Sequence, residues 1–255
     1  MTNSVLWREL TAAQLRDGPA AGALVLLPVA STEQHGPHLA TGVDDVLCSE
    51  ICRRVAEALV SAGKPSVVAP TLWCGLAEHH VAFGGSFTLT LPTYHALLRD
   101  LCRSILRAGF RYILIVNGHG GNMSALAALT VDLTRELDAP IATTTYFLAA
   151  QEEFASILED QRSVLHACEA ETSMMMVVRP DLVDSARLPD AFGQGADSPS
   201  AILSPTLNRW RSFRDLSETG VLGDARRASA EKGERLIEAV VNGMARRLLA
   251  GEPWA

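Results

Sequence analysis

The sequence lacks the features that mark membrane, secreted and nucleic-acid-binding proteins. None of its apolar runs approaches the roughly 20 residues that cross a bilayer, and its first residues do not form the basic and then apolar stretch of a signal peptide. The five cysteines are odd in number and include no C-x-x-C pair, as expected of reduced thiols in the cytosol. The net charge of −7 comes with no basic cluster, which argues against nucleic acid as a partner. We therefore expect a soluble, cytoplasmic protein that binds neither membranes nor nucleic acids.

What the sequence does contain is an alternation of short apolar strands and amphipathic helices. Hydrophobic residues make up 48% and charged residues 20% of the chain, which is typical of a globular protein with a sizeable core. Such an alternation predicts an α/β fold with a mainly parallel sheet covered by helices on both faces. The predicted strands are 23–29, 66–70, 86–91, 112–116 and 140–147, and the predicted helices are 44–62, 93–108, 122–137, 148–160 and 229–249.

Residues 184–220 break this alternation. Proline and glycine recur through the segment, and no helical or strand periodicity is visible. A loop of this length in a compact domain is usually functional or lies at an interface. Two interpretations stay open: a segment that shapes the functional site, and a plain surface excursion.

The most informative stretch is 117–122, Asn-Gly-His-Gly-Gly-Asn, which directly follows the predicted strand 112–116. Its three glycines let the backbone pass close to a ligand. In open α/β sheets, ligands bind just outside the carboxyl ends of strands. His119, the large polar side chain of this turn, is therefore expected to take part in chemistry.

Three further candidates follow the first predicted strand. Glu33 and His35 lie two residues apart, so both side chains project to the same side of an extended segment, and Asp44 opens the next helix. Together with His119, these carboxylates and imidazoles form a donor set suited to zinc, manganese or iron. The structural alternative makes Asp44 a helix cap and Glu33 a solvated loop charge.

A second group of polar residues precedes the methionine-rich run 174–176. Glu169 or Glu171 is a candidate metal ligand, and His166 is a candidate for proton transfer. The alternative for both glutamates is to cap the helix that follows them. We expect the methionines to lie in the core, and Cys168 to be a buried apolar residue rather than a nucleophile.

Adjacent histidines at the end of 75–80, Gly-Leu-Ala-Glu-His-His, form a third group. Either imidazole is suited to contact a substrate or to orient a metal ligand. The alternative places one of them at the surface, where His95 is also expected.

Taken together, these segments resemble the creatininase family of amidohydrolases. The resemblance covers roughly residues 22–245, and its motifs agree in order and spacing over 33–38, Asp44, 117–122 and 166–173. It implies one domain over residues 1–255, with three α/β/α layers and a mostly parallel sheet, usually assembled as a homohexamer. It also implies two divalent metal ions per chain, zinc first and manganese or iron as alternatives. These ions would activate water against a non-peptide C–N bond of a small-molecule amide.

The resemblance assigns roles residue by residue. One metal ion would be held by Glu33, Asp44 and His119. The other would take His35, with Asp44 bridging the two ions. His166 matches the family histidine that shuttles a proton to the departing nitrogen.

One ligand position departs from the family pattern. Creatinine-hydrolysing members complete the second metal site with a carboxylate where this chain has Gly121. We expect Glu171 to replace it, with Glu169 as the second choice, and we count Glu171 with His166 among the catalytic residues. The residues expected to contact the substrate are His80, Gly120, Gly121 and Asn122.

Two further departures bear on the substrate. His79 stands where the family has glutamate, and His80 aligns with the family histidine. Tryptophan occurs only at 7, 73, 210 and 254, so the tryptophan clamp between the third and fourth motifs of creatinine-specific members is missing. We therefore expect a small cyclic amide, a lactam or a formamide rather than creatinine.

Alternatives remain inside and outside the family resemblance. Some members deformylate a pyrimidine intermediate, and others trim the mycofactocin precursor peptide. From another functional class, a catalytically inactive metal- or ligand-binding protein would keep the same scaffold. Gly121 and His79 are the residues that favour that last alternative.

Overall fold

A four-stranded parallel sheet forms the centre of the computed structural model, which describes residues 4–159, 161–194 and 206–255. The strands are β1 (Leu24–Val29), β2 (Ser66–Val68), β3 (Tyr112–Asn117) and β4 (Ile141–Thr145), in the spatial order β2-β1-β3-β4. The parallel register places Val29 beside Asn117, and Asn117 beside Thr145. Every residue of β1 is buried, as expected of a parallel strand that is covered on both faces.

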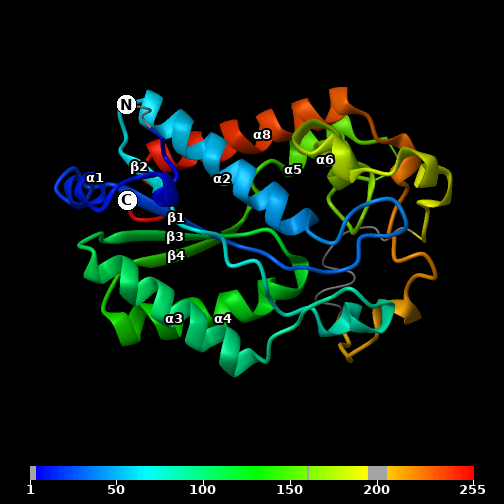
Figure 1. The fold of residues 1–255 in the computed structure, drawn as a ribbon, viewed down its shortest axis with the longest axis horizontal. Helices are drawn as coiled ribbons and strands as arrows, with labels where there is room; N and C mark the ends of the chain where they lie inside the picture. Colours follow the sequence, from blue (N-terminus) through cyan, green and yellow to red (C-terminus); the bar gives the residue numbers. More distant parts are fainter. Residues whose placement is uncertain (1–3, 160, 195–205) are drawn as a thin grey trace.

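Helices cover both faces of this sheet (Figure 1). The layer on one face contains α2 (Val43–Ser61), α5 (Gln151–Ile157), α6 (Glu169–Val178) and α8 (Ala230–Leu249). The layer on the other face contains α3 (Leu91–Arg107) and α4 (Met123–Leu137), and a short helix, α1 (Ala12–Asp17), precedes β1. Short 3₁₀ turns are η1 (Trp7–Glu9), η2 (Glu78–Phe83), η3 (Gly120–Asn122), η4 (Tyr146–Leu148), η5 (Pro180–Leu182), η6 (Ser185–Asp190), η7 (Phe213–Asp215) and η8 (Ala225–Arg227). The predicted α/β class and its three layers are confirmed.

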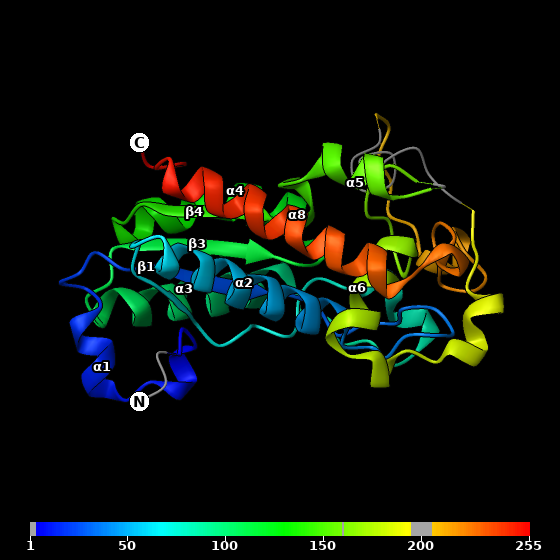
Figure 2. The same cartoon turned by 90° about the horizontal axis from the view of Figure 1, so that it is seen from above.

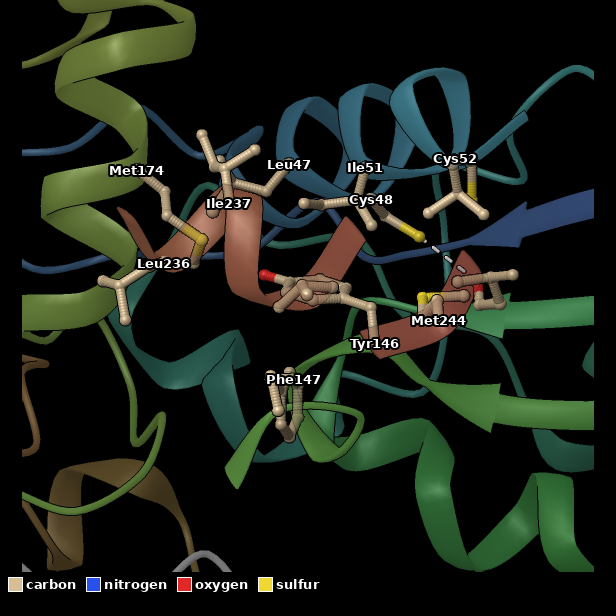
Figure 3. Packing of buried hydrophobic residues seen from close by; sticks show 14 of the residues in the cluster. Leu47, Cys48, Ile51, Cys52, Tyr146, Phe147, Met174, Leu236, Ile237 and Met244 are labelled. Atoms are coloured by element: carbon tan, nitrogen blue, oxygen red, sulfur yellow. Dashed lines mark hydrogen bonds between the residues drawn. The ribbon is translucent and has the colours of Figure 1, made fainter. Parts of the chain in front are cut away.

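Two apolar cores hold the layers together, because successive side chains of a strand point to opposite faces. Leu26 belongs to the core beneath α2, α6 and α8, whereas Val25 belongs to the core above α3 and α4. Figure 3 shows the first of these cores, where Leu47 of α2 and Leu236 of α8 approach Met174 of α6. Met174 is fully buried, which confirms that the methionine run contributes to the core.

The C-terminal helix α8 crosses the sheet next to α6, as the view from above shows (Figure 2). At their contact, Gly233 of α8 faces the backbone of Ser173 in α6. A Cβ atom at position 233 would overlap the Ser173 carbonyl oxygen. Glycine is therefore required for the two helices to pack this closely.

One predicted strand is wrong, and several boundaries move. Residues 86–90 are extended but pair with no strand; the Phe87 amide donates instead to the Thr32 carbonyl, and the Leu89 amide to the Gly75 carbonyl. The hydroxyl of Thr90 then accepts a hydrogen bond from the amide of Thr93 and caps α3. The predicted strand therefore leads directly into the start of a helix. Likewise, β4 stops before η4, and α5 is shorter than the predicted helix 148–160.

The irregular segment 184–220 contains only the 3₁₀ turns η6 and η7 among its described residues, 184–194 and 206–220; the remainder, 195–205, lies outside the described residues. All five cysteines are free and buried. Within the described ranges, no helix combines the length and the apolar character needed to cross a bilayer.

Candidate metal centre and active site

The candidate site lies where the two central strands end. β1 continues into the loop that carries Glu33 and His35, and β3 continues into the turn that carries His119. The chain passes from β1 to β2 on one side and from β3 to β4 on the other, so the strand order reverses between β1 and β3. Crevices at such switch points are the usual ligand sites of open α/β sheets.

Two asparagines fix the turn that presents His119. The Asn117 side chain accepts from the His119 amide at 3.1 Å and donates to the His119 carbonyl at 2.7 Å. The Asn122 amide donates to Asn117 Oδ1 at 3.2 Å and to the Ala30 carbonyl at 3.3 Å, and its oxygen accepts from the Leu76 amide at 3.0 Å. Both hydrogens of the buried Asn122 amide are therefore donated within the protein, one to the Asn117 side chain and one to the Ala30 backbone. Asn122 thus helps to hold the turn that carries His119, and its contact with a substrate stays a prediction.

The structure brings Glu33, Asp44 and His119 together. His119 Nδ1 lies 3.1 Å from Glu33 Oε2 and 3.1 Å from Asp44 Oδ2. His119 Nε2 lies 3.2 Å from the Leu76 carbonyl, to which it donates, so Nδ1 is the ring nitrogen that faces the two carboxylates. Both separations are close to the roughly 3.3 Å between neighbouring donor atoms around an ion bound at about 2.0–2.1 Å. Ligand atoms of Glu33, His35 and Asp44 also lie within 4.8 Å of one another.

Asp44 also faces a second imidazole. Its Oδ1 atom lies 3.3 Å from His35 Nε2, and His35 Nδ1 donates to the Glu33 carbonyl at 3.1 Å. The two Asp44 oxygens are thus divided between His119 and His35, which is the arrangement of a bridging carboxylate. Ligand atoms of His35, His166 and Glu171 also lie within 4.8 Å of one another, so the carboxylate from the first turn of α6 reaches this second group.

Glu169 points elsewhere. Its carboxylate accepts from Lys232 Nζ at 2.6 Å and from the Glu159 amide at 3.1 Å, and it has no exposed surface. Glu171 lines the candidate cavity instead. Two residues of α6 advance the side chain by about 200°, which separates the directions of these two glutamates.

Several buried polar atoms of the cluster have no hydrogen-bond partner among the described residues. They are both carboxylate oxygens of Glu33, Asp44 Oδ2 and His35 Nε2. Leaving such atoms unpaired in a protein interior costs about 1–3 kcal/mol each, and more when they are charged. A cation bound among these atoms would relieve that cost.

The electrostatics of the cluster agree with that description. Burial lowers the pKa of His35, but the nearby carboxylates, Asp44 foremost, outweigh burial and raise it to about 9. In the same way, Glu33 and Asp44 raise the pKa of His119 well above its ordinary value against the effect of burial. Burial raises the pKa of Glu171 to about 7, although His35 opposes this shift.

His80 and His166 lie on the other side of Glu33. His80 Nε2 is 3.2 Å and His166 Nδ1 is 3.6 Å from Glu33 Oε1. Burial, followed by the charge of neighbouring histidines, lowers the pKa of both imidazoles well below the ordinary value. These shifts favour the neutral form of both imidazoles in the metal-free protein.

Gly121 and His79 occupy linked positions. A Cβ atom on Gly121 would overlap His119 Nε2, and it would also lie 2.7 Å from the ring of His79. His79 stacks against His119, with ring centroids 5.7 Å apart and planes inclined by 19°. A side chain at position 121 would therefore collide with the hydrogen bond from His119 to Leu76 and with the His79 ring.

The cluster opens into a small cavity of about 50 Å³. Gly120, Gly121 and His80 line it, as expected for substrate contacts, and its apolar walls include Phe147. Phe213 of η7 also lines the cavity and packs on His80 and His166, with ring centroids 4.2 and 4.7 Å apart. Sequence reasoning missed Phe213; the signal was an aromatic residue in the irregular segment 184–220.

The comparisons with known proteins agree with this geometry. The family described as creatinine amidohydrolase matches residues 8–248. The mycofactocin precursor peptide peptidase of Mycolicibacterium smegmatis is 34% identical over 90% of this chain and 86% of its own. The creatinine amidohydrolase of Pseudomonas putida is 31% identical over 96% of both chains.

Solved structures give the same result. A crystal structure of creatinine amidohydrolase superposes with a TM-score of 0.83 and 27% identity, covering 99% of each chain. Matching creatininase structures include one described as a Mn form and a mutant described as Zn-Zn type. The match over most of the chain, the shared fold and the carboxylate–imidazole cluster at the sheet switch point make this chain a member of the creatininase family of hydrolases.

Proposed function

We propose that this chain is an amidohydrolase that holds two divalent metal ions and hydrolyses a C–N bond outside the peptide backbone. The observation that carries the proposal is Asp44, whose two oxygens face His119 and His35. The two oxygens of Glu33 have no hydrogen-bond partner among the described residues, and Oε2 lies 3.1 Å from His119 Nδ1. Both facts support the same interpretation.

The donor set fits two ions. We assign Glu33, Asp44 and His119 to one ion, and His35, Asp44 and Glu171 to the other. Carboxylate and imidazole donors without thiolate suit zinc, with manganese or iron as alternatives. When bound, such ions lower the pKa of water toward neutrality and polarise a carbonyl group.

The remaining residues handle the proton and the surroundings of the reaction. His166 presents Nδ1 toward Glu33 at the cavity and is proposed to carry a proton to the departing nitrogen. An amide nitrogen is a poor leaving group until it is protonated, so this step is required. Phe147 and Phe213 supply apolar walls that exclude bulk water, and the backbone of Gly120 and Gly121 allows close approach of the substrate.

The size of the cavity favours a small cyclic amide, lactam or formamide over a long peptide. A second candidate, a peptidase that trims the end of a precursor peptide, is favoured by the 34% identity to the mycofactocin precursor peptide peptidase. We also propose that residues 1–255 form a single domain, that the protein works in the cytoplasm and that it assembles as a homohexamer, as the family resemblance implies.

The first test is the metal content per chain, measured on protein purified without chelator and without a metal-affinity tag. We expect close to two equivalents of zinc, manganese or iron. His119→Ala should lose metal and all hydrolysis, whereas His95→Ala on α3 should keep both. A content of one equivalent or less that does not rise after metal is added would favour the inactive binding protein instead.

The substrate class is tested with two panels on the metal-loaded protein. One panel contains cyclic amides, lactams and formamides, and the other contains peptides cleaved near the C-terminus. Turnover confined to the first supports the leading proposal, and turnover confined to the second supports the peptidase.

A further inference from the structure

Gln34 lies in the chain between the candidate ligands Glu33 and His35, and its side chain is buried. The side-chain oxygen accepts from the Gly36 amide at 2.9 Å. The side-chain nitrogen lies 3.1 Å from the Gly220 carbonyl, 2.9 Å from His80 Nδ1 and 3.0 Å from His166 Nε2. One amide therefore contacts both imidazoles that flank Glu33.

The orientation of this amide is fixed by two backbone groups. The Gly36 amide can only donate, and the Gly220 carbonyl can only accept. If the Gln34 amide were rotated by 180°, its NH₂ group would face the N–H of Gly36, and its oxygen would face the carbonyl oxygen of Gly220. Neither pair can form a hydrogen bond. The nitrogen of Gln34 therefore faces Gly220 and the two histidines.

Counting hydrogens then determines the state of His80. The amide nitrogen has two hydrogens, and the Gly220 carbonyl takes one of them. His166 Nε2 lies 2.8 Å from the backbone carbonyl of Gln34, which only accepts, so this nitrogen is itself a donor and cannot take the second. The second hydrogen goes to His80 Nδ1, and the proton of the neutral His80 ring resides on Nε2, facing Glu33 Oε1 at 3.2 Å.

The same count determines the state of His166. Because His166 Nε2 carries the hydrogen that is donated to the Gln34 carbonyl, the lone pair of the neutral ring is on Nδ1. That lone pair faces the cavity and Glu33 Oε1 at 3.6 Å. The proton-accepting nitrogen of the site is thereby directed toward the place where substrate and water meet the cluster.

We infer that Gln34 is a positioning residue that sets the tautomers of two histidines: it turns the Nε2 hydrogen of His80 toward Glu33, and it directs the accepting nitrogen of His166 into the cavity. The catalytic consequence for His166 rests on the proposed function, whereas the tautomers themselves do not. A protonated Nε2 also prevents His80 from ligating a metal ion. Glu33 Oε1 then faces the Nε2 hydrogen of His80, while Oε2 faces His119.

The irregular segment of the chain takes part in this arrangement. Gly220 has a φ of +81°, and a Cβ atom there would overlap Gln34 Oε1. Leu222 pairs with His166 in an isolated antiparallel bridge, in which the Leu222 amide donates to the His166 carbonyl at 2.9 Å. Segment 213–222 therefore holds both Gln34 and His166 in place, in addition to bringing in Phe213.

The inference is tested by ¹⁵N NMR of the imidazole rings in chelator-treated protein with ¹⁵N-labelled histidine, at slightly alkaline pH. In the wild type, we expect the unprotonated nitrogen to be Nδ1 in both His80 and His166. An unprotonated Nε2 in either ring of the wild type overturns the inference, whether or not any variant folds.

Two variants and one control complete the experiment. In Gln34→Glu the side chain only accepts, so His80 Nδ1 should gain a proton and lose its unprotonated signal. In Gln34→Met, which neither donates nor accepts, His80 should show a mixture of tautomers. Gln161→Glu, at a buried glutamine that donates to the Ser163 carbonyl, should leave both rings unchanged. Unchanged rings in both Gln34 variants refute the inference, and because the protein is metal-free, this outcome is independent of whether it hydrolyses amides.

Discussion

The two glutamates at the start of α6 should give opposite results when each is changed to glutamine. Burial raises the pKa of Glu171 from its ordinary 4.5 to about 7 in the metal-free protein. The stabilisation that comes from holding this proton is complete below pH 4.5 and is lost as the pH rises through about 7. Above pH 7, the buried Glu171 carboxylate therefore destabilises the metal-free protein by roughly 3 kcal/mol relative to a neutral side chain.

Glu171→Gln removes that charge. At pH 8, the chelator-treated variant should be more stable than the wild type by up to about 3 kcal/mol, or on the order of 5–10 °C in Tm. The same variant should bind one metal equivalent fewer, because an amide is a poor replacement for a carboxylate ligand.

Glu169→Gln is the matched control on the same helix. Its carboxylate is buried against Lys232 Nζ at 2.6 Å, and Lys232 also pairs with Glu159, so neutralising Glu169 removes one of two carboxylates that face this largely buried ammonium. We expect a loss of about 1–3 kcal/mol in stability and an unchanged metal content. Urea unfolding of the chelator-treated wild type and both variants measures the predicted changes in stability. Zinc titration calorimetry on each protein measures the predicted metal content. Retention of two ions by Glu171→Gln together with loss of one by Glu169→Gln would refute the ligand assignment.

Two further predictions concern the surroundings of the metal ligands. Gly121→Ala should weaken zinc binding by about 10- to 100-fold, because its Cβ atom overlaps His119 Nε2 and breaks the hydrogen bond to Leu76. Gly42→Ala is the control: no atom lies within 4 Å of the added Cβ, so this variant should bind zinc as the wild type does. Zinc affinity should also rise with pH, about tenfold per pH unit for each displaced proton, and this rise should lessen above about pH 9, where His35 is already neutral. Zinc titrations measure both, and a pH-independent affinity would show that the metal displaces no proton from the cluster.

Much of the fold and the candidate cluster followed from the sequence for identifiable physical reasons. The runs that form β1 and β3 are apolar along their whole length because both faces of the sheet are covered. Carboxyl ends of neighbouring parallel strands meet at one edge of a sheet, so Glu33 and His119 were expected to lie close together. The spacing of two residues on α6 separates Glu169 from Glu171, but only the packing of α8 determines which of them faces the site.

What the sequence did not reveal depends on contacts between distant segments. The strand expected at 86–91 has the right alternation, but its amide groups of Phe87 and Leu89 donate to loop carbonyls rather than to a strand. Phe213 and Gly220 reach the cluster through an irregular segment whose course no local pattern encodes. The Asn122 side chain donates to Ala30 and Asn117 and accepts from Leu76, and spacing along the chain cannot show these three contacts.

The tight contact between Gly233 and Ser173 lets α8 limit the position of α6, the helix that carries Glu171. Ser173 is two residues from Glu171 on α6, so the depth at which that carboxylate enters the cluster is set by how closely α8 approaches. The ion pair between Lys232 of α8 and Glu169 of α6 lies near this contact. It fixes the position of α8 along the axis of α6. Related chains with a bulkier residue at the position of Gly233 would need a displaced α6. The position of the Glu171 carboxylate thus depends on a helix that contributes none of the proposed metal ligands.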